Sequence, residues 1–173
     1  APANANDVNA AERMKSLNLP FDPQASTVEF LSISDEPGAR LRATVEDFGP
    51  ILFSKILELN ETQESIISII FKYCEDKKLP LIDLEDIRRV LQYVTDSPEG
   101  KLELNSNYGT IAPASLGAIL RKIVGLEQQG ASKFFGEPSF DVQDLLQTRD
   151  GKGIVNIIRL VDVQNQPNLF STF

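Results

Sequence analysis

The stretch LEQQGASKFFGEPSFDVQDLL, from Leu126 to Leu146, decides how the chain folds. It begins at the end of a long helical pattern, crosses a loop with two adjacent aromatic residues, and leads into another helical pattern. Phe134 and Phe135 could form a platform for a ligand, but aromatic residues beside Gly-Glu-Pro more often anchor a loop to the core. Glu137 has no helix-capping role and is predicted to be an exposed loop acid. The stretch therefore specifies structure more clearly than it specifies chemistry.

Signals that begin helices recur on both sides of this stretch. Asn60 with Gln63, and Asp83 with Asp86, have the spacing of capping boxes. Two helices carry predicted apolar stripes: Ile51, Leu52, Ile56 and Leu57 after Pro50, and Leu116, Ile119, Leu120 and Ile123 after Pro113. Asp141 with Asp144 is expected to cap one more helix, which ends near Gln147. Residues 46–148 are thus predicted to form a helical subdomain, interrupted by a polar loop over 98–109.

Strand patterns lie outside this helical region. TVEFLSIS (27–34) and RLRATV (40–45) alternate in polarity across a turn, which predicts a β-hairpin over residues 27–45. GIVNIIRLV (153–161) is nearly continuous in apolar and β-branched residues, which indicates a strand buried on both faces. Such a strand needs neighbours that the hairpin alone cannot supply. We therefore expect the chain to be a piece of a larger protein that completes the sheet.

The predicted fold class is α+β and predominantly α-helical. Residues 1–26 form a loose arm with a short helix near Asn9–Leu17, and the hairpin follows over 27–45. The helical subdomain covers 46–148. Residues 149–173 hold the C-terminal strand and the start of a helix at Pro167.

Composition excludes several kinds of function. The formal net charge of -8 makes the chain a poor candidate for holding nucleic-acid phosphates by itself. The chain has no histidine and one cysteine, which argues against Ser-His-Asp or Cys-His catalysis and against a zinc site. Cys74 falls in register with apolar residues at helical spacing, so we expect a buried structural thiol. No apolar run approaches the roughly 20 residues that span a bilayer, and no signal-peptide pattern begins the chain.

Two motifs could suggest nucleotide chemistry. RDGKGI (149–154) contains a glycine and a lysine, but Leu146 stands where a phosphate-binding loop needs glycine, and Gly153 stands where it needs Ser or Thr. We expect the motif to be the turn that leads into the C-terminal strand. Asp83, Glu85, Asp86, Asp141 and Asp144 all have capping or first-turn explanations. The sequence therefore assigns no catalytic, cofactor-binding or metal-binding residue.

A family resemblance adds to this interpretation, and motifs along nearly the whole chain carry it. LNETQ and LEQQGASKFFGEP are its most specific parts. In order, the matching segments are 28–30, 41–45, 49–50, 59–63, 82–86, 108–109, 115–119, 126–130, 133–138, 141–145 and 151–157. The chain resembles the middle of bacterial HerA-like helicases, P-loop ATPases related to the HerA and FtsK DNA translocases.

The resemblance implies a place for the chain within a larger ATPase. The Walker A loop would lie upstream and the Walker B strand downstream, so the chain would be a helical insertion with one strand of a larger P-loop α/β sheet. ATP and Mg²⁺ would bind the parent and not this segment. The rest of the parent, neighbouring subunits of a hexameric ring and, through the parent, DNA would be the partners, in the cytoplasm and without a membrane. The alternative is a free-standing acidic helical module that binds a protein partner through an apolar groove.

Overall fold

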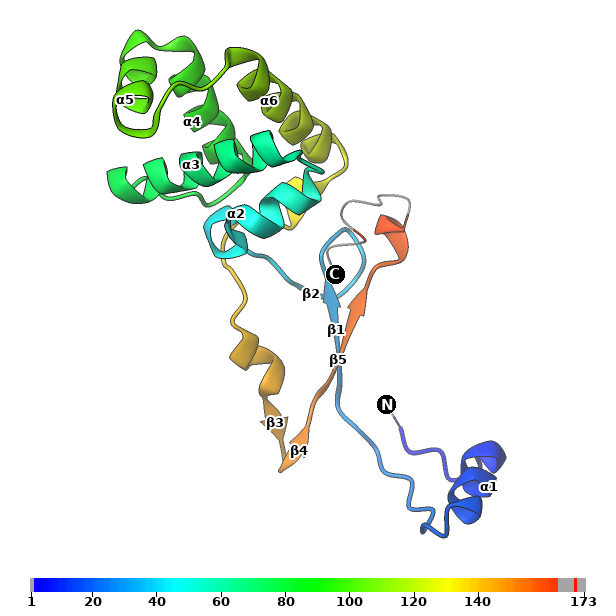
Figure 1. Ribbon diagram of the computed structural model, residues 1–173. Helices are drawn as coiled ribbons and strands as arrows, with labels where there is room; N and C mark the ends of the chain where they lie inside the picture. The colour runs from blue at the N-terminus through cyan, green and yellow to red at the C-terminus, as the bar shows by residue number, and fades with distance from the viewer. Residues whose placement is uncertain (1, 165–169, 171–173) are drawn as a thin grey trace.

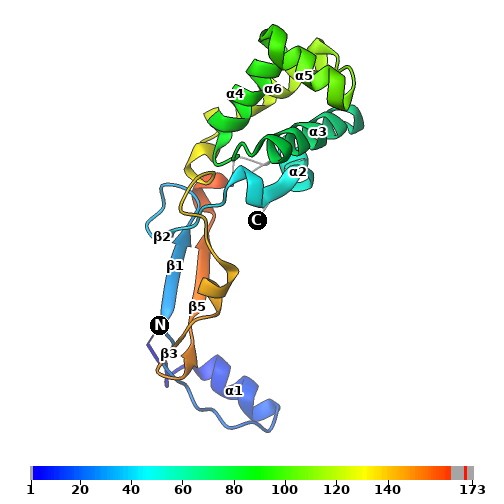
Figure 2. The same ribbon diagram turned by 90° about the vertical axis from the view of Figure 1, so that its left-hand side faces the viewer.

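Helices dominate the computed structural model, which describes residues 2–164 and 170. A helical body lies at one end of the molecule, and an arm that contains two paired strands runs away from it (Figures 1 and 2). The elements are α1 (Val8–Ser16), β1 (Val28–Ser32), β2 (Ala39–Arg40), α2 (Val45–Ile56), α3 (Glu61–Lys77), α4 (Leu84–Asp96), α5 (Pro98–Tyr108), α6 (Pro113–Gln128), η1 (Ala131–Lys133), η2 (Val142–Leu146), β3 (Thr148–Arg149), β4 (Lys152–Gly153), β5 (Val155–Arg159) and η3 (Val161–Val163), where η marks a 3-10 helix. The predicted α+β class, rich in helix, is confirmed.

The helical body, α2–α6, is held by one apolar core. Its most deeply buried side chains come from α2, α3, α4 and α6, and include Phe53, Ile67, Ile87, Leu91 and Ile123. Both predicted capping boxes are present, so α3 and α4 begin where the sequence predicts. These caps satisfy backbone N–H groups that the first turn of a helix leaves without partners.

One face of α2 is placed differently from the prediction. Ile56 and Leu57 are buried as expected, but Ile51 is 71% exposed and Leu52 is 47% exposed. Phe53 is fully buried, and with Ile56 and Leu57 it forms the i, i+3, i+4 face that enters the core. Because Phe53 sets that face, the two preceding apolar residues point away from it.

The predicted loop over 98–109 is wrong, since these residues form helix α5. Ser97 caps it by accepting a hydrogen bond from the Gly100 backbone N–H at 3.3 Å, and Pro98 occupies the first turn. Only Gly100 and Leu104 are buried in it. A Cβ at Gly100 would lie 2.5 Å from the Tyr93 carbonyl oxygen, so the glycine permits close packing of α5 on α4. A helix that buries so little side chain has no apolar periodicity to reveal it.

The predicted β-hairpin over 27–45 is also wrong. β2 has two residues and pairs with β1 in the parallel direction, with Leu31 opposite Ala39 and Ser32 opposite Arg40. The residues after β2 leave the sheet, because the backbone of Ala43 bonds to the loop at Phe134–Gly136 instead. From Arg42 on, the alternating pattern of 40–45 therefore reflects contact with the loop at 134–140 and not pairing with β1.

The C-terminal strand is present as β5, but it is not buried on both faces. It pairs in parallel with β1 along five residues, from Val28 opposite Val155 to Ser32 opposite Arg159. Val155 is 47% exposed, and Ile157 and Ile158 are each 40% exposed. Within the described residues β5 pairs along one edge only, with β1, and its apolar side chains stay partly exposed.

The short helices differ in how well they were predicted. α1 forms as expected and contains no buried residue, and it lies at the end of the arm away from the helical body (Figures 1 and 2). The helix predicted from Asp141 is the 3-10 helix η2. The helix predicted from Pro167 falls outside the described residues, except for Phe170.

Candidate functional site

The aromatic loop joins the helical body to the arm. Phe134 and Phe135 are 1% and 2% exposed, and their rings make edge-to-face contacts with each other and with Phe48. Phe135 also contacts Phe53 in the core of the body. The prediction that this pair anchors the loop is confirmed.

Backbone hydrogen bonds hold this loop against the segment that precedes α2. The Ala43 N–H donates to the Phe134 carbonyl at 3.1 Å, and the Gly136 N–H donates to the Ala43 carbonyl at 3.0 Å. Arg42 contributes both its carbonyl, which accepts from the Phe140 N–H at 2.8 Å, and its Nη1, which donates to the Glu137 carbonyl at 2.8 Å. Gly136 has φ of 142°, which favours glycine at this position.

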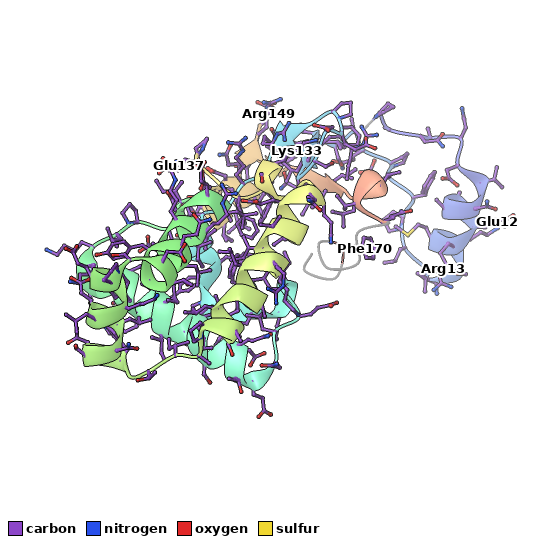
Figure 3. All side chains as sticks on the ribbon, turned by 90° about the horizontal axis from the view of Figure 1, so that it is seen from above. Glu12, Arg13, Lys133, Glu137, Arg149 and Phe170 are labelled. Carbon is purple, nitrogen blue, oxygen red and sulfur yellow. The ribbon has the colours of Figure 1, made fainter. Side chains whose placement is uncertain are left out.

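The Glu137 side chain is exposed, as predicted. Figure 3 places Glu137 and Lys133 in the region of the helical body, and places Glu12 and Arg13 of α1 well away from them. Lys133 forms an ion pair with Asp35, and this contact holds the pKa of the Asp35 carboxyl below its usual value. Glu137 thus contributes its backbone to the junction and presents its carboxylate to solvent.

Beside this junction lies a groove of about 710 Å³, which we call the acidic groove. Phe48 and Phe140 supply apolar surface beside the buried Phe134, and Leu52 and Val142 add more exposed apolar side chains. Asp47, in the first turn of α2, and Asp141, which precedes η2, also line it. Sequence analysis missed this groove, and the only signal for it was the pair Ile51-Leu52, which does not fit the apolar face that Phe53 sets.

The carboxylates near helix starts act as caps. Asp83 Oδ1 accepts hydrogen bonds from the backbone N–H groups of Glu85 and Asp86 at 2.8 and 3.0 Å. Asp141 accepts from the Gln143 N–H at 2.8 Å, and the Asp144 carboxylate accepts from the Gln147 side chain at 3.3 Å. Residues 2–164 contain no group of three or more His, Cys, Asp or Glu side chains arranged to hold a metal ion.

The RDGKGI motif is a turn, as predicted. β3 and β4 form a two-residue hairpin in which Asp150 and Gly151 have φ of 53° and 74°. Positive φ at both central residues is typical of the tight turn that matches the twist of antiparallel strands. Lys152 Nζ donates to the Gln24 side chain at 3.0 Å. The lysine therefore braces the arm and does not face a nest of backbone N–H groups.

Apart from Asp35, the ionisable groups with shifted pKa values lie on α3 and α5 of the helical body and do not line the acidic groove. Burial, with the nearby Glu46 and Asp86 carboxylates, raises the pKa of the Cys74 thiol to about 12, and the prediction that this thiol is buried is confirmed. The Tyr108 hydroxyl donates to Asp76 at 2.6 Å and, with Lys72, lowers the pKa of that carboxyl. Tyr73 and Lys77 lower the pKa of Glu103 in the same way. These contacts brace α3 against α5.

Among the described helices, none is by itself long and apolar enough to cross a membrane. Taken together, α5 and α6 are long and apolar enough, but the chain bends by 108° between them. In α6, however, Leu116, Ile119, Ile123 and Leu126 are buried in the core of the body.

Comparison with known proteins identifies the family. No curated protein and no solved structure matches the chain. A family model described as "Helicase HerA-like C-terminal" matches residues 1–173, and this match agrees with the motifs around LNETQ and LEQQGASKFFGEP. Because the match covers the whole chain, the protein belongs to the HerA-like helicase C-terminal family.

Proposed function

We propose that this chain is a helix-rich insertion, with adjoining strands, of a HerA-like P-loop ATPase that translocates on DNA. In this proposal the parent protein binds ATP and Mg²⁺ through residues outside these 173. The chain contributes no catalytic residue of its own. Its work is mechanical or recognitional: the helical body shapes the surface of the assembly and contacts neighbouring subunits or substrate.

The exposed β1–β5 pair is the observation that carries this proposal. Side chains alternate between the two faces of a strand, so Val155 and Ile157 lie on one face and Ile158 on the other. All three remain 40% or more exposed, as does Phe30 of β1 at 49%. Full burial of each such side chain would contribute about 1.5–3 kcal/mol. A sheet with apolar residues on both faces is typical of α/β domains, in which helices cover each face.

The helical body, by contrast, already has a closed core. It is joined to the arm through the hydrogen bonds of Arg42 and Ala43 with the loop at 134–140. Phosphoryl transfer requires a phosphate loop, a magnesium ion and an oriented nucleophile. An element without these groups can influence the reaction only through its contacts with the parts that have them. The helical body would influence ATP hydrolysis through its junction with the arm, at Arg42, Ala43 and the loop at 134–140.

The isolated chain tests the catalytic half of the proposal. We expect it neither to bind ATP measurably nor to hydrolyse it in the presence of Mg²⁺, because Lys152 braces Gln24 in a hairpin turn. Isothermal titration calorimetry and a coupled ATPase assay provide the measurements, with Lys152→Ala as the matched variant. Magnesium-dependent turnover by the pure wild-type chain that is lost in Lys152→Ala would overturn the proposal.

The longer protein tests the other half. Its gene should encode a G-x-x-x-x-G-K-[ST] loop upstream of this segment and an apolar strand ending in two acids downstream. We expect ATP hydrolysis by the longer protein, and we expect replacement of residues 46–133 by a short Gly/Ser linker to alter its stimulation by DNA more than its basal turnover. A longer protein with no such loop and no ATPase activity would favour a protein-interaction module instead.

A further inference from the structure

Helix α1 has an apolar face that the described structure covers only in part, since Ala10, Ala11 and Met14 are half-buried. None of its residues is buried, and Leu17, which follows it, is 50% exposed. Successive residues of a helix are about 100° apart, so Ala10, Ala11 and Leu17 lie on the same side of the helix as Met14. Short helices are marginal in water unless such a face is packed. The remaining exposed part of this face is therefore available for a further contact.

The charges of α1 are arranged on the flanks of this apolar face. Arg13 and Lys15 are the sequence neighbours of Met14, so each lies about 100° from it, in opposite directions around the helix. Glu12 lies two residues from Met14 and faces away. Neither Arg13 nor Lys15 forms an ion pair within the described residues. The helix thus presents an apolar ridge with one cation on each side.

The acidic groove offers the opposite charges beside apolar surface. Leu52, 47% exposed, and Val142, 62% exposed, offer apolar surface around a floor held rigid by the Phe134 contacts. Asp47 and Asp141 stand on two different elements, α2 and the start of η2. Neither carboxylate has an ion-pair partner in the described part of the chain.

The groove cannot be filled by the α1 of the same chain as the molecule is arranged. The groove lies where the helical body meets the arm, and α1 lies at the far end of the arm (Figures 1 and 2). Figure 3 likewise shows Glu12 and Arg13 well separated from the helical body. The acidic groove can therefore bind α1 only from another copy of the chain.

We propose that α1 of one copy docks, apolar face down, into the acidic groove of a second copy, with Arg13 and Lys15 against Asp47 and Asp141. This is recognition of an amphipathic helix by a groove. The contact joins two different surfaces, so it is head-to-tail and adds copies in series, closing into a ring or continuing as a filament. It does not depend on the ATPase function proposed above, since it uses only surfaces of this chain.

Charge reversal of the full 173-residue chain tests the docking. In sedimentation velocity we expect the wild-type chain to self-associate with rising concentration. Arg13→Glu/Lys15→Glu and Asp47→Lys/Asp141→Lys should each raise the dissociation constant by about tenfold or more. Mixing the two reversed chains should restore association, because the acidic helix of one then meets the basic groove of the other. Leu102→Glu is the control: Leu102 is 69% exposed on α5, outside the groove, and its substitution should leave association unchanged.

Cross-linking distinguishes this contact from pairing of sheet edges. Leu17→Cys and Val142→Cys chains, mixed under oxidised glutathione, should form a disulfide between the two different chains, while the buried Cys74 stays unreacted. Each variant alone should form far less cross-linked dimer. Circular dichroism and thermal unfolding establish that every variant is folded. A wild-type chain that stays monomeric, or association that survives both charge reversals, would overturn the proposal.

Discussion

At the scale of single residues, Cys74 shows how burial removes reactivity. The thiolate is the reactive form of cysteine, and a pKa of about 12 leaves almost none of it at pH 8. We expect iodoacetamide to label Cys74 slowly in the folded chain and rapidly in guanidinium chloride, as followed by mass spectrometry. Ser65→Cys, at an exposed position of the same helix, supplies the control, since its new thiol should react quickly in the folded state. Equal labelling rates at positions 65 and 74 would contradict this account.

The Tyr108–Asp76 hydrogen bond predicts how stability responds to acid. Because the folded state lowers the pKa of Asp76, the stability linked to this group is present above the unfolded value of about 3.9. That stability is lost as the pH falls through the lowered folded pKa. Tyr108→Phe removes the first cause of the shift, so the melting temperature of this variant should fall less steeply below about pH 4 than that of the wild type. Tyr93→Phe, which removes a hydroxyl that does not contact Asp76, should keep the wild-type slope.

At the scale of elements, the cap of α4 gives a prediction that the sequence alone supports. Asp83→Ala removes the acceptor of two backbone N–H groups, at Glu85 and Asp86, and should lower the free energy of unfolding by about 1 kcal/mol. Urea denaturation followed by circular dichroism measures the change. Asn105→Ala, at an exposed position within α5, should stay within about 0.5 kcal/mol of the wild type. A loss at Asn105 equal to that at Asp83 would show that the cap is not the cause.

Elements were predictable from sequence where their signals are local. Capping boxes need only residues three apart, so the starts of α3 and α4 were found. α5 was missed because its only buried residues are Gly100 and Leu104, and so little burial leaves no periodic pattern. The hairpin was wrongly inferred because alternation does not say what a strand pairs with, and Ala43 bonds to the loop at Phe134–Gly136, 91 or more residues away. The acidic groove depends on the same distant contact, so the pair Ile51-Leu52 was the only local pattern that pointed to it.

At the scale of the whole molecule, the helical body and the arm differ in how completely they bury their apolar side chains. Most of the buried apolar side chains belong to α2–α6 and the aromatic loop, whereas Phe30 of β1 and Val155, Ile157 and Ile158 of β5 stay exposed. The nearly continuous apolar pattern of residues 153–161 was correctly assigned to a strand, but its burial was not. An apolar strand pattern does not by itself show whether the strand is covered, and within the described residues β5 is covered only in part.

Ile157 provides the sharpest test of this difference. In the 173-residue chain it is 40% exposed, so Ile157→Lys can keep its charged group in water and should cost less than about 1 kcal/mol. If this chain is part of a longer protein, as proposed above, and flanking segments cover this face, the same substitution there buries an unpaired charge and should destabilise the fold by several kilocalories per mole. Leu146→Lys is the matched control, since Leu146 is 74% exposed and lies outside the β1–β5 pair. Urea denaturation of both lengths with both substitutions gives the comparison. A small and equal cost of Ile157→Lys in the two lengths would mean that this face of the sheet is also exposed in the longer protein. A large cost confined to the longer protein would mean that flanking segments cover the Val155–Ile157 face.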